Sequence, residues 1–182
     1  MKKVLYIIGG LLVFGLIGYF LYQTLVVSRR SPKDNVRFAE NGLEIEVNYS
    51  RPYKRGRLIF ADSSQQPLLP YGKYWRLGAN HATEISFSDD VSFGGKPVSA
   101  GTYRMYAVPG SDAFEISLNR EVGVSAAHIE PDYSRDVAKI KVPVQRAPVT
   151  EQLTISIDSP TDTVRMDIKW DDVLLRIPIV KR

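Results

Sequence analysis

Hydrophobic and polar residues alternate over short segments along most of the chain after residue 30. The clearest example is the segment 43–49, in which one side carries Leu43, Ile45, Val47 and Tyr49. A period of two with one polar side predicts a half-buried strand. Asn41-Gly42 lies directly before this segment and is typical of a hairpin turn, because both residues tolerate a positive φ.

Similar short segments follow, separated by Gly, Pro, Asn and Asp. They are 83–88, 91–93, 96–98, 102–108, 113–119, 137–145, 153–157, 164–170 and 173–179. We expect a tight turn at Asp171-Asp172. The long connection 120–135 is expected to carry a short helix or to cover an end of the sheets. No segment after residue 30 has a convincing helical period, so the pattern predicts a mainly β fold, an antiparallel β-sandwich of about nine strands, with a barrel as the alternative.

The first 30 residues are a different kind of segment. From Val4 to Val27 the chain carries no formal charge, and about 20 such residues are enough to cross the ~30 Å hydrocarbon core of a bilayer. We therefore predict one transmembrane signal-anchor helix in residues 1–30, in contact with the lipid bilayer through residues 4–27, ahead of a β domain in residues 31–182. A cleaved signal peptide is the alternative, although its apolar region is usually only about 7–15 residues long.

Composition and charge exclude several classes of function. The chain contains no cysteine, which excludes disulfides, thiolate zinc sites and a cysteine nucleophile. The net charge of +4 arises from Lys2, Lys3, Arg29 and Arg30, so the β domain is neutral overall. A nucleic-acid-binding domain normally carries a basic excess, so we expect no nucleic-acid partner. The basic residues at the two ends of the anchor nearly balance and do not decide which way the domain faces.

The segment 51–81 is the richest in side chains suited to recognition. Arginine offers a planar fork for carboxylate or phosphate, and aromatic rings offer faces for sugars or cations. The predicted ligand-binding face consists of Arg51, Arg57, Trp75, Arg76, Asn80 and His81. The structural alternative is that Trp75 belongs to the core, the arginines pack on tyrosines or pair with acids, and Asn80 caps a turn.

No catalytic, metal or cofactor motif stands out in the sequence. His81 and His128 are far apart and lack metal-ligand spacing. The segment 123–127 lacks the second glycine of a nucleophile elbow, and Asp89-Asp90 is explained by turn chemistry. We therefore expect no catalytic residue, no metal and no cofactor, and we favour a protein that is not an enzyme.

Several longer strings of residues resemble a known family. They are Val47-Asn48-Tyr49-Ser50-Arg51-Pro52, Lys54-Arg55-Gly56-Arg57, Pro70-Tyr71-Gly72-Lys73, Trp75-Arg76-x-Gly78-Ala79-Asn80 and Ala100-Gly101-Thr102-Tyr103. From Ser31 to Ile179 the chain resembles the bacterial family DUF2911. The resemblance implies a cell-envelope protein, usually exported behind a secretion signal, with its domain facing the periplasm. The family has no established activity, so the resemblance implies no catalytic residues; the long anchor and His81, where an acidic residue is expected, depart from its pattern.

These observations favour a membrane-anchored, single-pass protein whose β-sandwich binds an unknown envelope ligand or protein. One rival is an envelope hydrolase that uses His81, the Asp89-Asp90 pair and the arginines, and this rival requires two of those groups within hydrogen-bond reach. A second rival is a purely structural module with no ligand. The sequence leaves the oligomeric state open.

Overall fold

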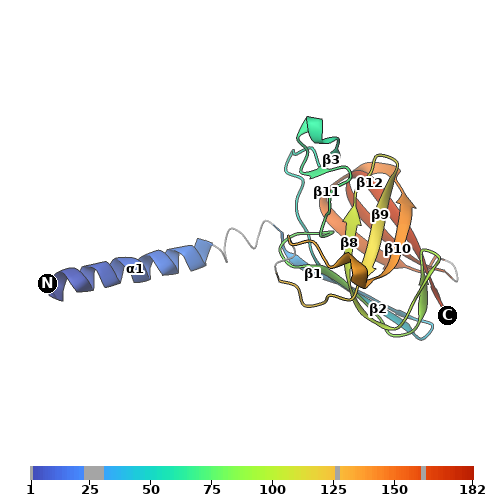
Figure 1. Ribbon diagram of the computed structural model, residues 1–182, viewed down its shortest axis with the longest axis horizontal. Coiled ribbons are helices and arrows are strands. Elements are labelled where there is room, and N and C mark those ends of the chain that lie inside the picture. The colour runs from blue at the N-terminus through green and yellow to red at the C-terminus, as the bar shows by residue number, and fades with distance from the viewer. Residues whose placement is uncertain (1, 23–30, 126–127, 161–162) are drawn as a thin grey trace. The chain divides into compact units, whose positions relative to one another are not determined.

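The computed structural model describes residues 2–22, 31–125, 128–160 and 163–182. The chain divides into two compact units, Met1–Pro32 and Lys33–Arg182. The first unit contains the helix α1 (Lys2–Tyr22), and the second contains all the strands of the described residues (Figure 1).

Helix α1 is apolar on all sides after Lys2 and Lys3, and large side chains in its described part are exposed, among them Leu11, Phe14 and Phe20. Within the described part of the chain, no helix is long and apolar enough to cross a membrane. The predicted span 4–27 continues past the end of α1 into residues 23–27, which lie outside the described residues.

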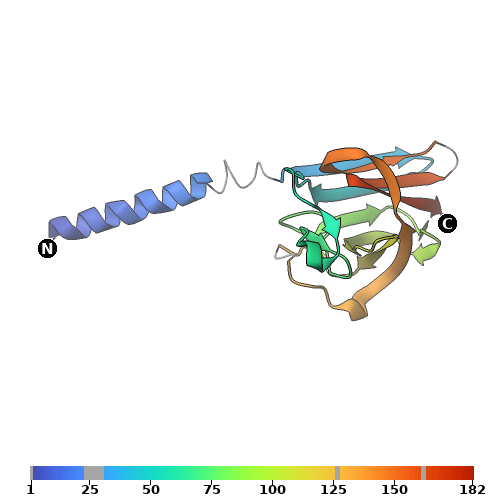
Figure 2. The same ribbon diagram turned by 90° about the horizontal axis from the view of Figure 1, so that it is seen from above.

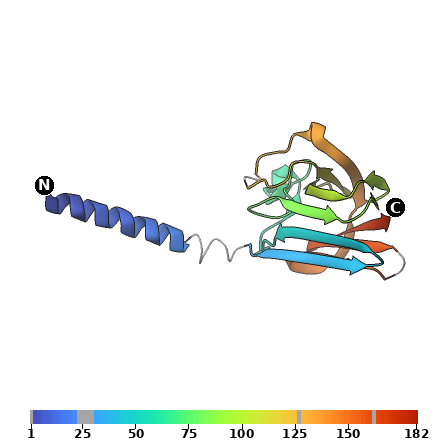
Figure 3. The same cartoon turned by 90° about the horizontal axis from the view of Figure 1, so that it is seen from below.

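The β domain contains a six-stranded antiparallel sheet in the order β1-β2-β5-β8-β9-β10. Its strands are β1 (Lys33–Glu40), β2 (Leu43–Ser50), β5 (Thr83–Phe87), β8 (Gly101–Val108), β9 (Ala113–Asn119) and β10 (Asp136–Pro143). Figure 3 shows β1, β2 and β5 side by side at one edge of this sheet.

A second antiparallel sheet has four strands in the order β11-β12-β6-β7. They are β11 (Gln145–Asp158), β12 (Val164–Lys181), β6 (Val91–Phe93) and β7 (Lys96–Val98). A short parallel pair, β3 (Phe60–Ala61) and β4 (Leu69–Pro70), and two 3₁₀ turns, Ser63–Gln65 and Tyr133–Arg135, complete the domain. Strand β1 lies beside β11 and β10 lies beside β7, so the two sheets meet along both sides (Figure 2).

The two sheets share one hydrophobic core. Alternate residues of β2 enter it, and Ile45, Val47 and Tyr49 are almost fully buried. The centre of the core is aromatic: the rings of Trp75 and Trp170 stack with centroids 5.8 Å apart. Burial of such large side chains is the main contribution to the stability of a domain without disulfides.

The predicted mainly β fold with antiparallel sheets is confirmed, and the predicted hairpin at Asn41-Gly42 is present. Both turn residues have positive φ, +53° and +71°, and Glu40 pairs directly with Leu43. The described residues form twelve strands instead of about nine. Among the additional strands are β3 and β4, which have two residues each and are too short to show a period in the sequence.

The tight turn predicted at Asp171-Asp172 is wrong, because β12 runs unbroken from Val164 to Lys181. Asp171 does have a positive φ of +56°. The pairing of β11 with β12 shifts register on either side of Thr150, the partner of Asp171. The left-handed residue is therefore accommodated by an irregularity in a long strand pair, and the chain does not reverse there.

In its described residues, the long connection 120–135 carries the expected short helix, the 3₁₀ turn Tyr133–Arg135, and contacts outward side chains of β8 and β9. Two contacts fix this position. Arg104 of β8 donates to Ile129 O (2.6 Å), and Asn119 of β9 donates to Asp132 O (2.8 Å). The outward side chains Arg104, Tyr106, Ser117 and Asn119 of β8 and β9 are thus buried. Most outward side chains of β1, β2 and β5 are exposed or half-buried.

Candidate functional site

The six residues predicted from the sequence lie in different environments. Arg51 follows β2 directly and joins the two sheets, because Nε donates to Leu153 O (3.0 Å) and Nη2 to Thr154 Oγ1 (2.9 Å). Its Nη1 lies 3.2 Å from Asp34 Oδ2. Each guanidinium nitrogen has a partner within the domain, so Arg51 holds β11 and β1 against the end of β2.

Arg57 and Trp75 also contact their own domain. The exposed Arg57 donates to the carbonyl oxygens of Tyr53 and Lys54 and closes its own loop. Trp75 is 3% exposed and forms an isolated bridge with Ala107. Trp75 therefore belongs to the hydrophobic core, as the alternative to a ligand-binding role predicts.

Arg76, Asn80 and His81 lie in the loop that leads into β5. Asn80 has a φ of +61°, and Arg76 Nη1 lies 3.4 Å from Asn80 O, which is long for a hydrogen bond. His81 is exposed. It is the one of the six predicted residues that lines the pocket described next.

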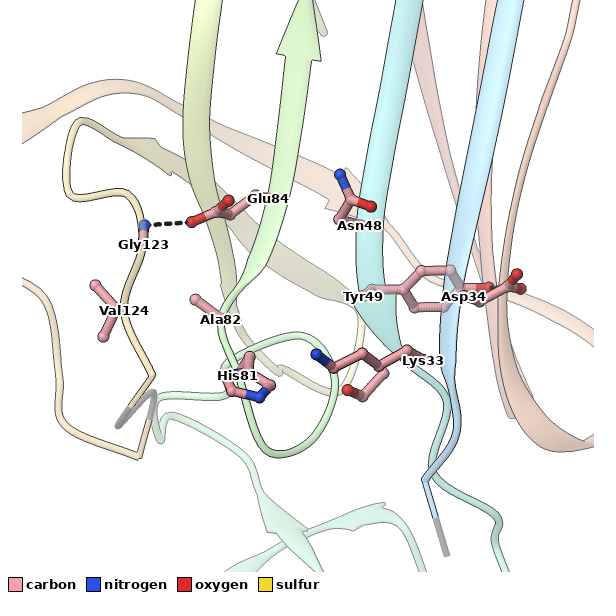
Figure 4. Close-up of a pocket in the computed structure, with 10 residues that line it drawn as sticks. Lys33, Asp34, Asn48, Tyr49, His81, Ala82, Glu84, Gly123 and Val124 are labelled. Atoms are coloured by element: carbon pink, nitrogen blue, oxygen red, sulfur yellow. Dashed lines mark hydrogen bonds between the residues drawn. The ribbon is translucent and has the colours of Figure 1, made fainter. Parts of the chain in front are cut away.

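A pocket of about 350 Å³ opens beside β1, β2 and β5 of the six-stranded sheet (Figure 4). We call it the β1–β2–β5 pocket. Its lining residues come from four separate segments of the chain: Lys33, Asp34, Asn48, Tyr49, Ser50, His81, Ala82, Glu84, Gly123 and Val124. Strands form its floor, and the loop after β9 forms one wall.

Strand register explains why polar groups gather there. Asn48 of β2 pairs with Glu84 of β5, so the two side chains project from the same outer face. Their neighbours Val47 and Ile85 point inward and are fully buried. The same alternation that builds the core thus provides the polar floor of the pocket.

The acidic side chains of the pocket have partners within the protein, and the basic side chains have none in the part of the chain that the structure describes. The carboxylates have partners: Glu84 accepts the backbone N–H of Gly123 (2.5 Å), and Asp34 pairs with Arg51. Among the described residues, neither the Lys33 ammonium nor the His81 imidazole has a hydrogen-bond or ion-pair partner. Figure 4 shows the Lys33 side chain extending toward His81, so these two groups are available to a ligand.

The hydroxyl of Tyr49 is engaged beneath the pocket. It accepts the Ile155 N–H (2.9 Å) and donates to Asp34 Oδ2 (3.3 Å). Burial raises the pKa of Tyr49 above its ordinary value. The ring therefore supports the pocket floor and links it to β11, and its hydroxyl is occupied.

His81 and the Asp89-Asp90 pair, which an envelope hydrolase would need close together, lie at opposite ends of β5. His81 precedes β5 and Asp89 follows it, and a five-residue strand spans about 16 Å at ~3.3 Å per residue. Asp89 pairs with Lys181 (3.0 Å), and Asp90 accepts the Ala100 N–H (2.9 Å). No group of three or more His, Asp or Glu side chains in the described ranges is arranged to hold a metal ion.

Arg104, Glu121 and Tyr74 form a polar cluster beside the 120–135 connection that the sequence pattern does not predict. Arg104, only 1% exposed, lies 3.4 Å from Glu121 and donates to the Tyr74 hydroxyl (2.5 Å). Arg104 sits at an outward position of β8 between Tyr103 and Met105, where alternation alone predicts an exposed side chain. The connection that buries it lies elsewhere in the sequence, so no local signal could have revealed the cluster.

The fold and the pocket define a mainly β domain with an outward-facing polar pocket, preceded by an apolar helix. The chain belongs to the family described as "Protein of unknown function (DUF2911)", whose model matches residues 31–179. This match spans the β domain and confirms the resemblance seen in the sequence. No curated protein and no solved structure matches the chain.

Proposed function

We propose that this protein is a binding module that takes a small polar ligand into the β1–β2–β5 pocket. The observation that carries the proposal is that Lys33 and His81 point into an open pocket without partners among the described residues. Both side chains are exposed, and they converge on one concavity from separate segments of the chain. A few polar groups that converge in a pocket are the feature expected of a ligand site.

The pocket also suggests the chemistry of its ligand. Lys33 and His81 offer donors, and on the opposite side Glu84 offers its second carboxylate oxygen; Glu84 Oε1 accepts the Gly123 N–H, and Asn48 Oδ1 accepts from the Asn35 amide. A molecule that combines hydrogen-bond acceptors with hydroxyl or amino donors fits this arrangement. The separation of His81 from Asp89 favours binding over hydrolysis by these two groups.

We further propose that the N-terminal segment tethers this module to a membrane and that the domain faces the periplasm. The helix α1 by itself does not meet the requirement for a span. The proposal rests on the uncharged segment 4–27, which exceeds the about 20 residues a bilayer requires, and on the exposed apolar side chains of α1. The periplasmic orientation rests on the family resemblance, since the charges at the two ends nearly balance.

The pocket can be tested by NMR titration of the full chain in detergent with N-acetylglucosamine, L-alanine and glycerol 3-phosphate. These probes present sugar, zwitterionic and anionic groups. We expect at least one to shift the backbone signals of His81 and Gly123 saturably. The double variant Lys33→Met/His81→Phe should abolish the effect, because it removes both unpaired donors.

Lys96→Met is the matched control, because Lys96 is an exposed lysine on β7 that does not line the pocket. It should leave the titration unchanged. If none of the probes shifts the pocket signals, or if the double variant still responds, the ligand-binding proposal fails and a structural module is favoured.

A further inference from the structure

A second concavity shares Val124 with the β1–β2–β5 pocket. Its volume is about 500 Å³, and its lining residues are Arg104, Arg120, Glu121, Val122, Val124, Ile129, Glu130 and Arg135. We call it the arginine pocket. It combines three guanidinium groups with an apolar wall of valine and isoleucine.

We propose that the arginine pocket binds a monocarboxylate that carries an apolar body. Arg120 is the main contact. Its side chain is exposed, and it has no hydrogen-bond or ion-pair partner among the described residues; only its backbone N–H is used, toward Arg135 O (3.2 Å). A planar guanidinium fork without a partner is suited to bidentate binding of a carboxylate.

Arg135 and Arg104 complete the positive side of the pocket. Arg135 is exposed and lies 3.8 Å from Glu121, a distance that leaves most of its donors unused. Arg104 acts from beneath as a positioning residue. It holds Glu121 and Ile129 in place, and its Nε is buried without a hydrogen-bond partner in the described structure.

The charge balance and the apolar wall set the ligand class. Three arginines face two glutamates, of which Glu121 is paired with Arg104 and Glu130 accepts the Tyr133 hydroxyl (2.6 Å). The excess of one positive charge matches a monoanion better than a phosphate dianion. Val122 and Ile129 are 49% and 59% exposed, and an apolar group on the ligand would cover them.

Butyrate is a suitable probe, measured by NMR titration of the full chain through the arginine Nε–H signals. We expect saturable shifts of the Arg120 and Arg135 signals. Arg120→Gln should weaken binding by about tenfold or more, because one charge-assisted bidentate contact is lost. The matched control is Arg146→Gln on β11, which removes an exposed arginine outside the pocket and should leave butyrate affinity unchanged.

Two further ligands separate the parts of the proposal. 1-Butanol has the same apolar body without charge, and inorganic phosphate has charge without the apolar body; both should bind more weakly than butyrate. Equal binding of either one, the absence of saturation with butyrate, or equal losses in R120Q and R146Q would overturn the proposal. The two pockets share Val124. The test of the arginine pocket is distinguished from that of the β1–β2–β5 pocket because it is read from arginine side chains and uses other variants.

Discussion

Trp75 and Trp170 stack in the centre of the core with an interplanar angle of 26°, and Phe60 meets both rings edge-on. Trp75 comes from a loop and Trp170 from the long strand β12, so the pair fixes the loop that leads to His81 against the four-stranded sheet. The loop that brings His81 to the β1–β2–β5 pocket is therefore held by the hydrophobic core.

Trp75→Ala should therefore destabilise the domain by about 3–5 kcal/mol, the usual cost of removing a large buried aromatic side chain. Trp75→Phe keeps most of the packing and should cost clearly less. Urea unfolding followed by circular dichroism measures both. A loss below about 1 kcal/mol for the alanine variant would be typical of a surface position and would contradict the core assignment.

Arg51 and Arg57 should differ sharply on substitution although both were predicted to bind ligand. Arg51→Met removes two hydrogen bonds to β11 and the contact with Asp34, and should cost about 2 kcal/mol in the free energy of unfolding. Arg57→Met affects an exposed side chain that bonds only to its own loop, and should cost less than about 1 kcal/mol. Equal losses in urea titrations would show that Arg51 does not join the sheets.

The stability of the domain should fall at high pH, partly through Tyr106. Burial, and then the hydrogen bond from its hydroxyl to Asp136 (2.6 Å), raise the pKa of Tyr106 far above its ordinary value. Because the protonated form is favoured in the folded state, its contribution is complete below the unfolded pKa of about 10 and is lost as the pH rises toward the folded value.

Tyr106→Phe should thus lower stability near neutral pH by about 1 kcal/mol through the lost hydrogen bond. It should also make the stability fall less steeply above about pH 10 than in the unsubstituted protein. Urea midpoints at several pH values measure both effects. Identical slopes in the two proteins would mean that Tyr106 does not titrate differently on folding.

The proposed orientation can be read from a single introduced cysteine, because the chain has none of its own. Ser111 is exposed in the turn between β8 and β9. A membrane-impermeant maleimide should label Ser111→Cys while the cytoplasmic membrane is intact. Labelling that appears only after this membrane is broken would place the domain in the cytoplasm.

The sequence predicted most of the sheet framework, because alternation and Asn-Gly or Gly-Gly turns are local signals. It also selected His81 as a candidate ligand-binding residue, and His81 lines the pocket. It did not reveal the rest of the pocket, since Lys33, Asn48 and Glu84 are brought together by strand pairing over long separations. Gly123 joins them from a loop through its hydrogen bond to Glu84. The role of Arg51 was hidden for the same reason, as its partners Leu153 and Thr154 lie a hundred residues further along the chain.

Asp171 shows a second limit of local patterns. A pair of acidic residues between two alternating segments is typical of a turn, and Asp171 does adopt a left-handed conformation. Its carboxylate pairs with the ammonium group of Lys54, far away in the sequence. That contact and the pairing with β11 keep β12 continuous, and neither is visible from the neighbouring residues.

In the proposed function, the β1–β2–β5 pocket receives a ligand through Lys33 and His81. The most direct measurement is a crystal structure of the protein soaked with N-acetylglucosamine, L-alanine and glycerol 3-phosphate. We predict density for a bound molecule within hydrogen-bond distance of both the Lys33 ammonium and the His81 imidazole. A pocket in which these two side chains pair with the protein itself, with no bound molecule at saturating concentrations, would contradict the claim.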